Sequence, residues 1–138
     1  MVKLITGLKG SGKTKRLVEL VKEAVAMENG DVVCIEKEKK LTYDIPYTAR
    51  LIEAGEYDIG SYEFIKGFIC GLHSGNYDIT HVFIDNFLKI VSDKESARFA
   101  EFLKWLDAFS TAENIEFVLS VSLDPETVDE DIKKYIIL

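Results

Sequence analysis

Short apolar runs alternate with helical hydrophobic periods along most of the chain. Runs rich in Val, Ile and Phe and bounded by turn-forming residues predict strands at residues 2–6, 31–36, 80–85, 115–122 and 135–138. Segment 48–54 fits either a strand or a short helix, and we favour a strand. The charged run 36–40 and the segment 41–47, which contains Pro46, predict an irregular connection before it.

Helical spacing of apolar residues begins at Lys13 and continues until residues 29–30, Asn-Gly, give a stop signal. Ser61 can cap a second helix. The apolar face expected for this helix comprises Phe64, Phe68, Gly71 and Leu72. Because Gly67 and Gly71 lack side chains, we expect a neighbouring element to approach the helix closely there.

Two further helices are predicted in the second half of the chain. Ser92 and Glu95 have the spacing of a capping box that opens a long helix. The core-facing stripe of this helix comprises Phe99, Phe102, Leu103, Leu106 and Phe109. Pro125 can begin a last, short helix before the final predicted strand.

Strands separated by helix-length segments indicate a parallel sheet, because parallel strands require crossover connections. We therefore expect an α/β fold with three αβα layers, in which helices cover both faces of a mainly parallel five- or six-stranded sheet. Residues 1–138 contain no repeat, linker or low-complexity segment and have the length of one domain. The chain is therefore expected to form a single domain.

Composition and net charge disfavour two classes of partner, membranes and nucleic acids. With 47% apolar and 30% charged residues, the chain has an ordinary globular composition, and its apolar runs are too short for membrane insertion. A formal net charge of −7 disfavours nucleic acid as a partner. Met1 leads directly into strand-like residues, and Cys34 and Cys70 lie in apolar stretches. We expect a cytoplasmic protein with two buried, reduced thiols.

The segment GLKGSGKT, residues 7–14, lies between the first predicted strand and the first predicted helix. Its glycines allow successive N–H groups to turn toward one point, and the helix N-terminus adds its dipole there. Lys13 supplies a mobile charge for the β- and γ-phosphates, and the Thr14 hydroxyl can bind Mg²⁺. The predicted nucleotide-binding residues are Gly7, Leu8, Lys9, Gly10, Ser11, Gly12, Lys13, Thr14 and Lys15.

Asp85 ends the most strand-like run of the chain, HVFID. In open α/β sheets, ligands bind at the carboxyl ends of the strands, so this carboxylate is a second candidate site residue. The next residue is Asn86. An amide can orient a water molecule but cannot accept its proton.

On the GLKGSGKT loop and the VFID strand end, the chain resembles the P-loop NTPase superfamily, and in its layout a minimal RecA-like or ASCE-type domain. The resemblance implies the P-loop NTPase fold, binding of Mg²⁺ and ATP, and a catalytic role for Lys13. It also implies that Asp85 is the Walker B acid, which holds Mg²⁺ opposite Thr14. Many members have a glutamate after this acid, which prepares the attacking water, and Asn86 occupies that position here as a candidate catalytic residue. Because its amide cannot accept a proton, either hydrolysis is slow or another carboxylate activates the water.

RecA-like ATPases carry their catalytic glutamate at the end of the strand that follows the P-loop helix. By this resemblance Glu38 is the candidate catalytic residue and Glu36 the second choice, although the run 36–40 also has the composition of a solvated charged connection. Ser120 resembles the polar sensor that ASCE-type NTPases carry on the strand beside the Walker B strand.

Two other resemblances remain open. The layout is also similar to thymidine kinases, but these carry a glutamate after the Walker B acid and a zinc-binding lasso domain, and the sequence has neither. The chain is similar as well to short bacterial P-loop proteins labelled twitching-motility ATPases, although pilus-retraction motors of that type are far longer.

The sequence therefore predicts an ATP-binding P-loop protein that uses Mg²⁺ and hydrolyses ATP slowly, or only when a homo-oligomer or another protein partner completes the site. ATP is favoured over GTP because no NKxD-type guanine motif occurs. One alternative is a nucleotide-sensing module that does not hydrolyse its ligand. Another is a kinase of thymidine-kinase-like architecture that acts on a nucleoside or another small metabolite.

Overall fold

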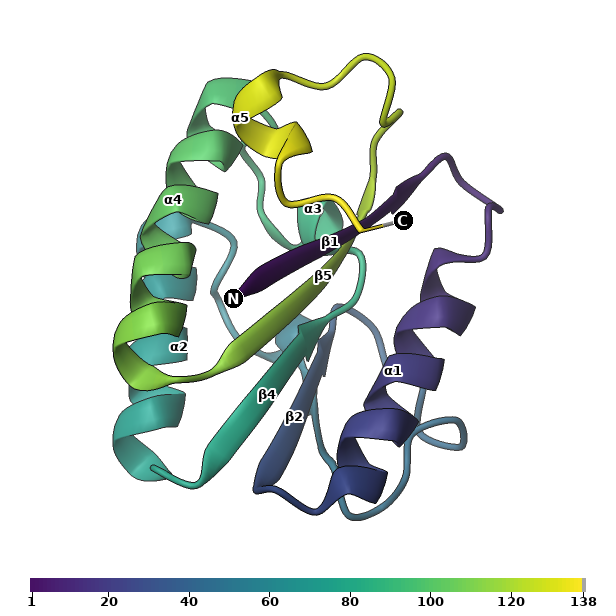
Figure 1. The fold of residues 1–138 in the computed structure, drawn as a ribbon, viewed down its shortest axis with the longest axis vertical. Coiled ribbons are helices and arrows are strands. Elements are labelled where there is room, and N and C mark those ends of the chain that lie inside the picture. The colour runs from purple at the N-terminus through teal and green to yellow at the C-terminus, as the bar shows by residue number, and fades with distance from the viewer. Residues whose placement is uncertain (138) are drawn as a thin grey trace.

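A five-stranded sheet lies at the centre of the computed structural model, which describes residues 1–137 (Figure 1). All neighbouring strands are parallel, and their order across the sheet is β1-β5-β4-β2-β3. The strands are β1 (Val2–Gly7), β2 (Asp31–Glu36), β3 (Arg50–Glu53), β4 (Ile79–Ile84) and β5 (Glu116–Ser122). The predicted α/β class with a parallel sheet is confirmed, and segment 48–54 contains a strand, as favoured.

Helices flank the sheet and connect its strands, except that residues 37–49 join β2 to β3 without a helix, as the sequence predicts. They are α1 (Lys13–Met27), α2 (Tyr62–Gly75), α3 (Phe87–Ile90), α4 (Ser96–Glu113) and α5 (Glu130–Lys133), with a single 3₁₀ turn at Ala54–Glu56. The first predicted helix is confirmed at its start and ends at Met27, because Glu28 takes the left-handed conformation (φ 53°) and donates its N–H to Val25. The short helix α3 was not predicted from the hydrophobic pattern.

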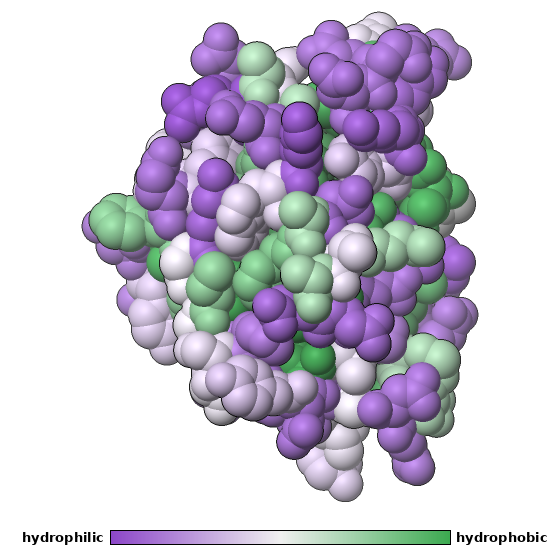
Figure 2. All heavy atoms as spheres, turned by 60° about the vertical axis from the view of Figure 1, so that its left-hand side comes forward, coloured by the Kyte–Doolittle hydropathy of each residue, from purple (hydrophilic) through white to green (hydrophobic). Residues whose placement is uncertain are grey.

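The sheet has a separate apolar layer on each face. On one face α1 packs through Leu17 and Val21 against a cluster that includes Phe83. On the other face α2 and α4 pack against a larger cluster in which Phe102 and Phe117 are fully buried. Figure 1 shows the resulting layers, with α1 on one side of the sheet and α2 and α4 on the other. On the outer side along α4 and α2, hydrophobic and hydrophilic residues are interspersed (Figure 2).

The predicted cap of α2 is confirmed, but its predicted apolar face is only partly right: Phe68 and Leu72 pack against the core, whereas Phe64 and Gly71 are exposed. The Ser61 hydroxyl accepts the N–H of Phe64 at 3.1 Å. Phe64 itself is 59% exposed, and the buried positions are Tyr62, Ile65 and Ile69. The side of α2 that faces the core is therefore centred on Tyr62, Ile65 and Ile69, with Phe68 and Leu72 partly buried beside them. No neighbour approaches within 4 Å of a Cβ placed on Gly67 or Gly71, so the expected close approach does not occur there.

The predicted capping box before the long helix is also wrong. Helix α4 begins at Ser96, with Glu95 at its N-cap and no side-chain cap. The Ser92 hydroxyl instead donates to the carbonyl of Gly60 at 3.3 Å, which links the segment to the start of α2. The core stripe is confirmed for all but its last residue: Phe99, Phe102, Leu103 and Leu106 are buried, and Phe109 is partly buried.

Two predictions near the C-terminus require correction. Pro125 lies in a turn, and the last helix, α5, begins five residues later at Glu130. The predicted final strand, 135–138, is reduced to one parallel bridge between Ile136 and Leu4, and Leu138 lies outside the described residues. No helix in residues 1–137 has the length and apolar character needed to cross a membrane.

The two cysteines lie in different environments, which corrects the expectation of two buried thiols. Cys34 is fully buried in β2, whereas Cys70 is exposed on α2. Burial, together with the nearby carboxylates of Asp85 and Glu36, raises the pKa of the Cys34 thiol to about 12. The thiolate is the reactive form of cysteine, so Cys34 is inert in the folded protein.

We expect a thiol reagent such as Ellman's reagent to modify one cysteine rapidly in the folded chain and the second only on unfolding. The fast phase should be lost in Cys70→Ser and retained in Cys34→Ser, because only Cys70 is accessible. Two fast phases in the wild-type chain would contradict the placement of Cys34 in the core.

Candidate functional site

The GLKGSGKT segment forms the connection between β1 and α1, with positive backbone φ angles at its glycines. Gly7 has φ 144°, and a Cβ there would lie 2.3 Å from the Ser11 hydroxyl oxygen. Gly12 has φ 88° immediately before α1, a conformation that other residues rarely adopt. The first turn of α1 has no side-chain cap and no acidic residue. Its first N–H groups are therefore available to an anion.

Lys13 is the first residue of α1 and is only 8% exposed. Its ammonium donates to the carbonyl of Leu8 at 3.0 Å, which folds the side chain back over the loop. Burial lowers the pKa of Lys13 below the ordinary lysine value, the nearby Asp85 carboxylate opposes the shift, and the charge of Lys89 adds to it. A buried ammonium gains from an anionic ligand, because the ligand compensates the cost of burial.

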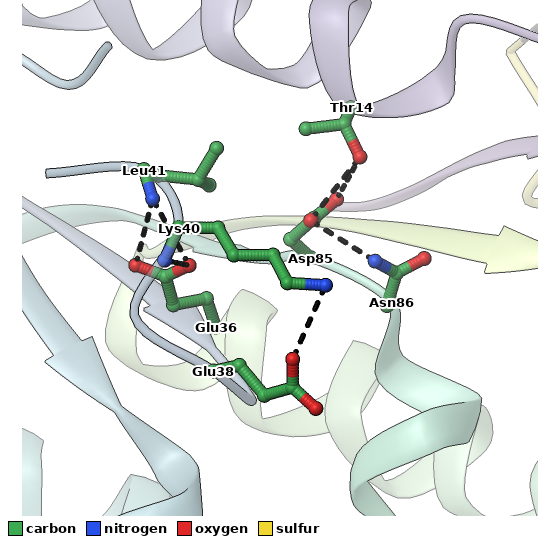
Figure 3. Close-up of polar contacts among 7 residues, drawn as sticks. All are labelled: Thr14, Glu36, Glu38, Lys40, Leu41, Asp85 and Asn86. Carbon is green, nitrogen blue, oxygen red and sulfur yellow. Dashed lines mark hydrogen bonds and ion pairs between the residues drawn. The ribbon is translucent and has the colours of Figure 1, made fainter. Parts of the chain in front are cut away.

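The Asp85 carboxylate is the polar centre of the site (Figure 3). It is 5% exposed and accepts the Thr14 hydroxyl at 3.1 and 3.2 Å. The Ser120 hydroxyl donates to it at 2.6 Å and accepts the N–H of Asn86 at 2.8 Å. The side-chain amide of Asn86 donates to the second carboxylate oxygen at 3.2 Å. Three side chains therefore satisfy a carboxylate that would otherwise be costly to bury.

The topology of the sheet brings these residues together. Strand β5 lies between β1 and β4, with Ile5 opposite Ser120 on one side and Ile84 opposite Leu119 on the other. The carboxyl ends of all three strands therefore meet at one edge, where Asp85 directly follows β4. Asn86 makes the turn there with φ 50°, a left-handed conformation that Asn tolerates better than most residues. The loop after β1 and the start of α1 lie at the same edge.

Glu36 and Glu38 have different surroundings (Figure 3). Glu36 ends β2, is buried, and accepts the backbone N–H groups of Lys40 at 2.8 Å and Leu41 at 3.2 Å, which holds the turn between them. Glu38 is exposed and pairs with the Lys40 ammonium at 3.1 Å. The hydrogen bond from Lys40 is the main cause that lowers the pKa of Glu38. A lowered pKa weakens a carboxylate as a general base.

Two adjoining cavities lie at this edge of the sheet. The first, of about 390 Å³, is lined by the loop and α1 residues Lys9, Gly10, Gly12, Lys13, Thr14 and Lys15, with Asn86, Lys89 and Ser122. The second, of about 240 Å³, is lined by Thr14, Glu36, Lys37, Glu38, Lys40, Leu41, Asp85, Asn86 and Lys89. A larger cavity of about 620 Å³ includes the first residues of β2, β3 and β4, at the opposite end of these strands.

Where the two cavities meet, the side chains offer two oxygen ligands for Mg²⁺. No group of three or more His, Cys, Asp or Glu side chains within residues 1–137 is arranged to hold a metal. Mg²⁺ bound together with a nucleotide takes one or two protein oxygens and completes its shell with phosphates and water. The Thr14 hydroxyl and the Asp85 carboxylate, within 3.2 Å of each other, provide two such oxygens.

Most of the sequence-predicted residues lie at this one edge. Leu8, Lys9, Ser11 and Lys15 belong to the loop and the first turn of α1, and Ser11 donates its N–H to Leu8 at 3.1 Å. Sequence reasoning missed Lys89, which lines both cavities, because nothing in the apolar pattern indicates the short helix that carries it. Comparison of the chain with protein-family models gives no match, and comparison with curated proteins gives none either.

The Ser120 hydroxyl should contribute measurably to stability. We expect Ser120→Ala to lower the free energy of unfolding by about 1–3 kcal/mol, because the Asp85 carboxylate loses a donor and the Asn86 N–H loses its acceptor, both near the core. Urea denaturation followed by circular dichroism measures this. Ser122→Ala, two residues along the same strand at an exposed position, is the matched control and should change stability by less than about 0.5 kcal/mol. Equal stabilities of the two variants would contradict the network.

Proposed function

We propose that this chain binds the phosphates of ATP together with Mg²⁺ at the carboxyl edge of β1, β4 and β5. One observation carries the proposal: the Thr14 hydroxyl and the Asp85 carboxylate, 71 residues apart in the sequence, lie within 3.2 Å of each other beside a glycine loop that ends at an uncapped helix N-terminus. Backbone N–H groups and a helix N-terminus favour an anion, and the paired oxygens favour a hard cation. Triphosphate and Mg²⁺ together satisfy both requirements.

The roles of the loop residues follow from their positions. The backbone of the 7–14 segment and the start of α1 would surround the phosphates, and the Lys13 ammonium would exchange its contact with the Leu8 carbonyl for phosphate oxygens. Thr14 and Asp85 would hold Mg²⁺, which when bound neutralises phosphate charge and orients the phosphate chain. Ser120 and Asn86 keep the carboxylate in position.

We infer that the isolated chain turns ATP over slowly. Asn86 follows Asp85, and its amide cannot accept a proton. Of the remaining carboxylates that line the second cavity, Glu36 already accepts two backbone N–H groups and Glu38 is exposed, with a lowered pKa. Neither environment favours a general base, so a partner that rearranges the turn at residues 37–41 would be needed for fast hydrolysis.

A nucleotide-sensing function is the second candidate, and the same turn favours it. The backbone of Lys40 and Leu41 is held by Glu36, and the turn lines the cavity that also contains Asp85. A ligand that changes the position of this turn would present a different surface to a partner.

Calorimetric titration of MgATP should give a saturable binding heat that is lost in Lys13→Ala. The reason is that the variant removes the buried ammonium beside the loop. Lys22→Ala, on the exposed side of α1, is the matched control and should bind like the wild-type chain. If the folded wild-type chain gives no heat with MgATP, the proposal is wrong.

The fate of the nucleotide distinguishes enzyme from sensor. We expect slow phosphate release, and Glu38→Gln and Glu36→Gln tested side by side will identify any activating carboxylate. Loss of release with unchanged binding in one of them would assign it as the catalytic base. Binding without any phosphate release would favour the sensor. Consumption of ATP only when a small acceptor molecule is added would indicate a phosphotransferase.

A further inference from the structure

Lys89 lies at the junction of the two cavities without being part of the glycine loop. Among residues 1–137, Thr14, Asn86 and Lys89 alone line both cavities, and Lys89 is the one cation of these three. It belongs to α3, which follows Asp85 and Asn86 directly. The ring of Phe87, fully buried against Phe99 and Phe102, holds this short helix against the core. The exposed Lys89 side chain is therefore carried by a fixed backbone.

The cavity beside the loop is strongly basic in a chain that is acidic as a whole. Four lysines line it, Lys9, Lys13, Lys15 and Lys89, and no Asp or Glu is among its described lining residues. The formal net charge of the chain is −7. A concentration of one sign of charge in a hollow attracts a ligand of the opposite sign and accelerates its association. The basic character of this cavity fits a polyanion.

The charge of Lys89 acts on groups in both cavities. Burial is the main cause that lowers the pKa of Lys13, and repulsion from Lys89 adds to it. The hydrogen bond from Lys40 is the main cause that lowers the pKa of Glu38, and Lys89 again contributes. Within residues 1–137, no carboxylate forms an ion pair with Lys89. Its ammonium is therefore available to a ligand at the junction.

We propose that Lys89 binds the terminal phosphate of the nucleoside triphosphate and makes the site prefer triphosphates to diphosphates. This inference rests on the proposed function. In this binding mode the loop would hold two phosphates in the first cavity, and a third phosphate would extend past Thr14 to the junction of the two cavities, which Lys89 and Asn86 line. A diphosphate bound in the same way would end before this junction. Lys9 and Lys15 line the first cavity but not the second, so they lie away from the junction and their charges should act on both nucleotides alike.

Calorimetric titration of MgATP and of MgADP tests this preference. Lys89→Ala should weaken ATP binding about fivefold, the size of a partly solvated charge interaction, and change ADP binding less than twofold. Lys89→Arg, which keeps a cation, should retain most of the preference. Lys15→Ala should weaken both nucleotides by similar factors, and Lys22→Ala, away from both cavities, should change neither.

The two proposals fail differently. If the wild-type chain binds MgATP and Lys89→Ala leaves the ratio of ATP to ADP affinity unchanged, the role of Lys89 is wrong while the proposed function stands. If the wild-type chain binds neither nucleotide, both are wrong. Since ADP affinity reports the integrity of the loop, a fall in ATP affinity alone cannot result from misfolding of Lys89→Ala.

Discussion

The buried Asp85 carboxylate is the constraint on which the arrangement of the site depends. A charge at 5% exposure is costly unless hydrogen bonds compensate it, and its donors come from Thr14, Ser120 and Asn86. These belong to the start of α1, to β5 and to the turn after β4. One side chain thus joins three segments that the sequence separates by dozens of residues, and a shift of any of them would leave the carboxylate short of a donor.

The order of the strands places the side chains that form hydrogen bonds with Asp85. Because β5 lies between β1 and β4, Ser120 stands beside the strand that precedes Asp85 as well as beside the strand that leads into the loop. Helices cover both faces of the sheet, so the candidate site lies at the carboxyl edge of the strands, where α1 begins and where open α/β sheets bind their ligands. The same edge gathers lysines around the loop, although the chain as a whole is acidic. Fold and local charge therefore both favour an anionic ligand at this edge over the rest of the surface.

The predicted buried face was correct for a helix with one apolar face and partly wrong for a helix with two. The stripe of α4, which includes Phe99 and Leu106, offers a single apolar face, and the core buries it. Helix α2 carries Phe64 on one stripe and Ile65 on the next, and only packing against the sheet selects Ile65. Ser92 has the spacing of a cap, but its hydroxyl bonds to the distant Gly60 carbonyl instead. Local signals of this kind are overridden when a tertiary contact satisfies the same polar group.

The amino-acid sequence by itself determined the alternation of strands and helices, the parallel sheet, and the positions of the glycine loop and Asp85, because these depend on local spacing and short-range backbone preference. Only the tertiary structure decided that the side chains of Thr14 and Ser120 form hydrogen bonds to Asp85. It also decided that Glu36 holds a turn while Glu38 faces solvent, and that Lys89 lines the basic cavity. Those relations depend on strand order and on which face each helix buries, and both are settled by the packing of segments distant in sequence.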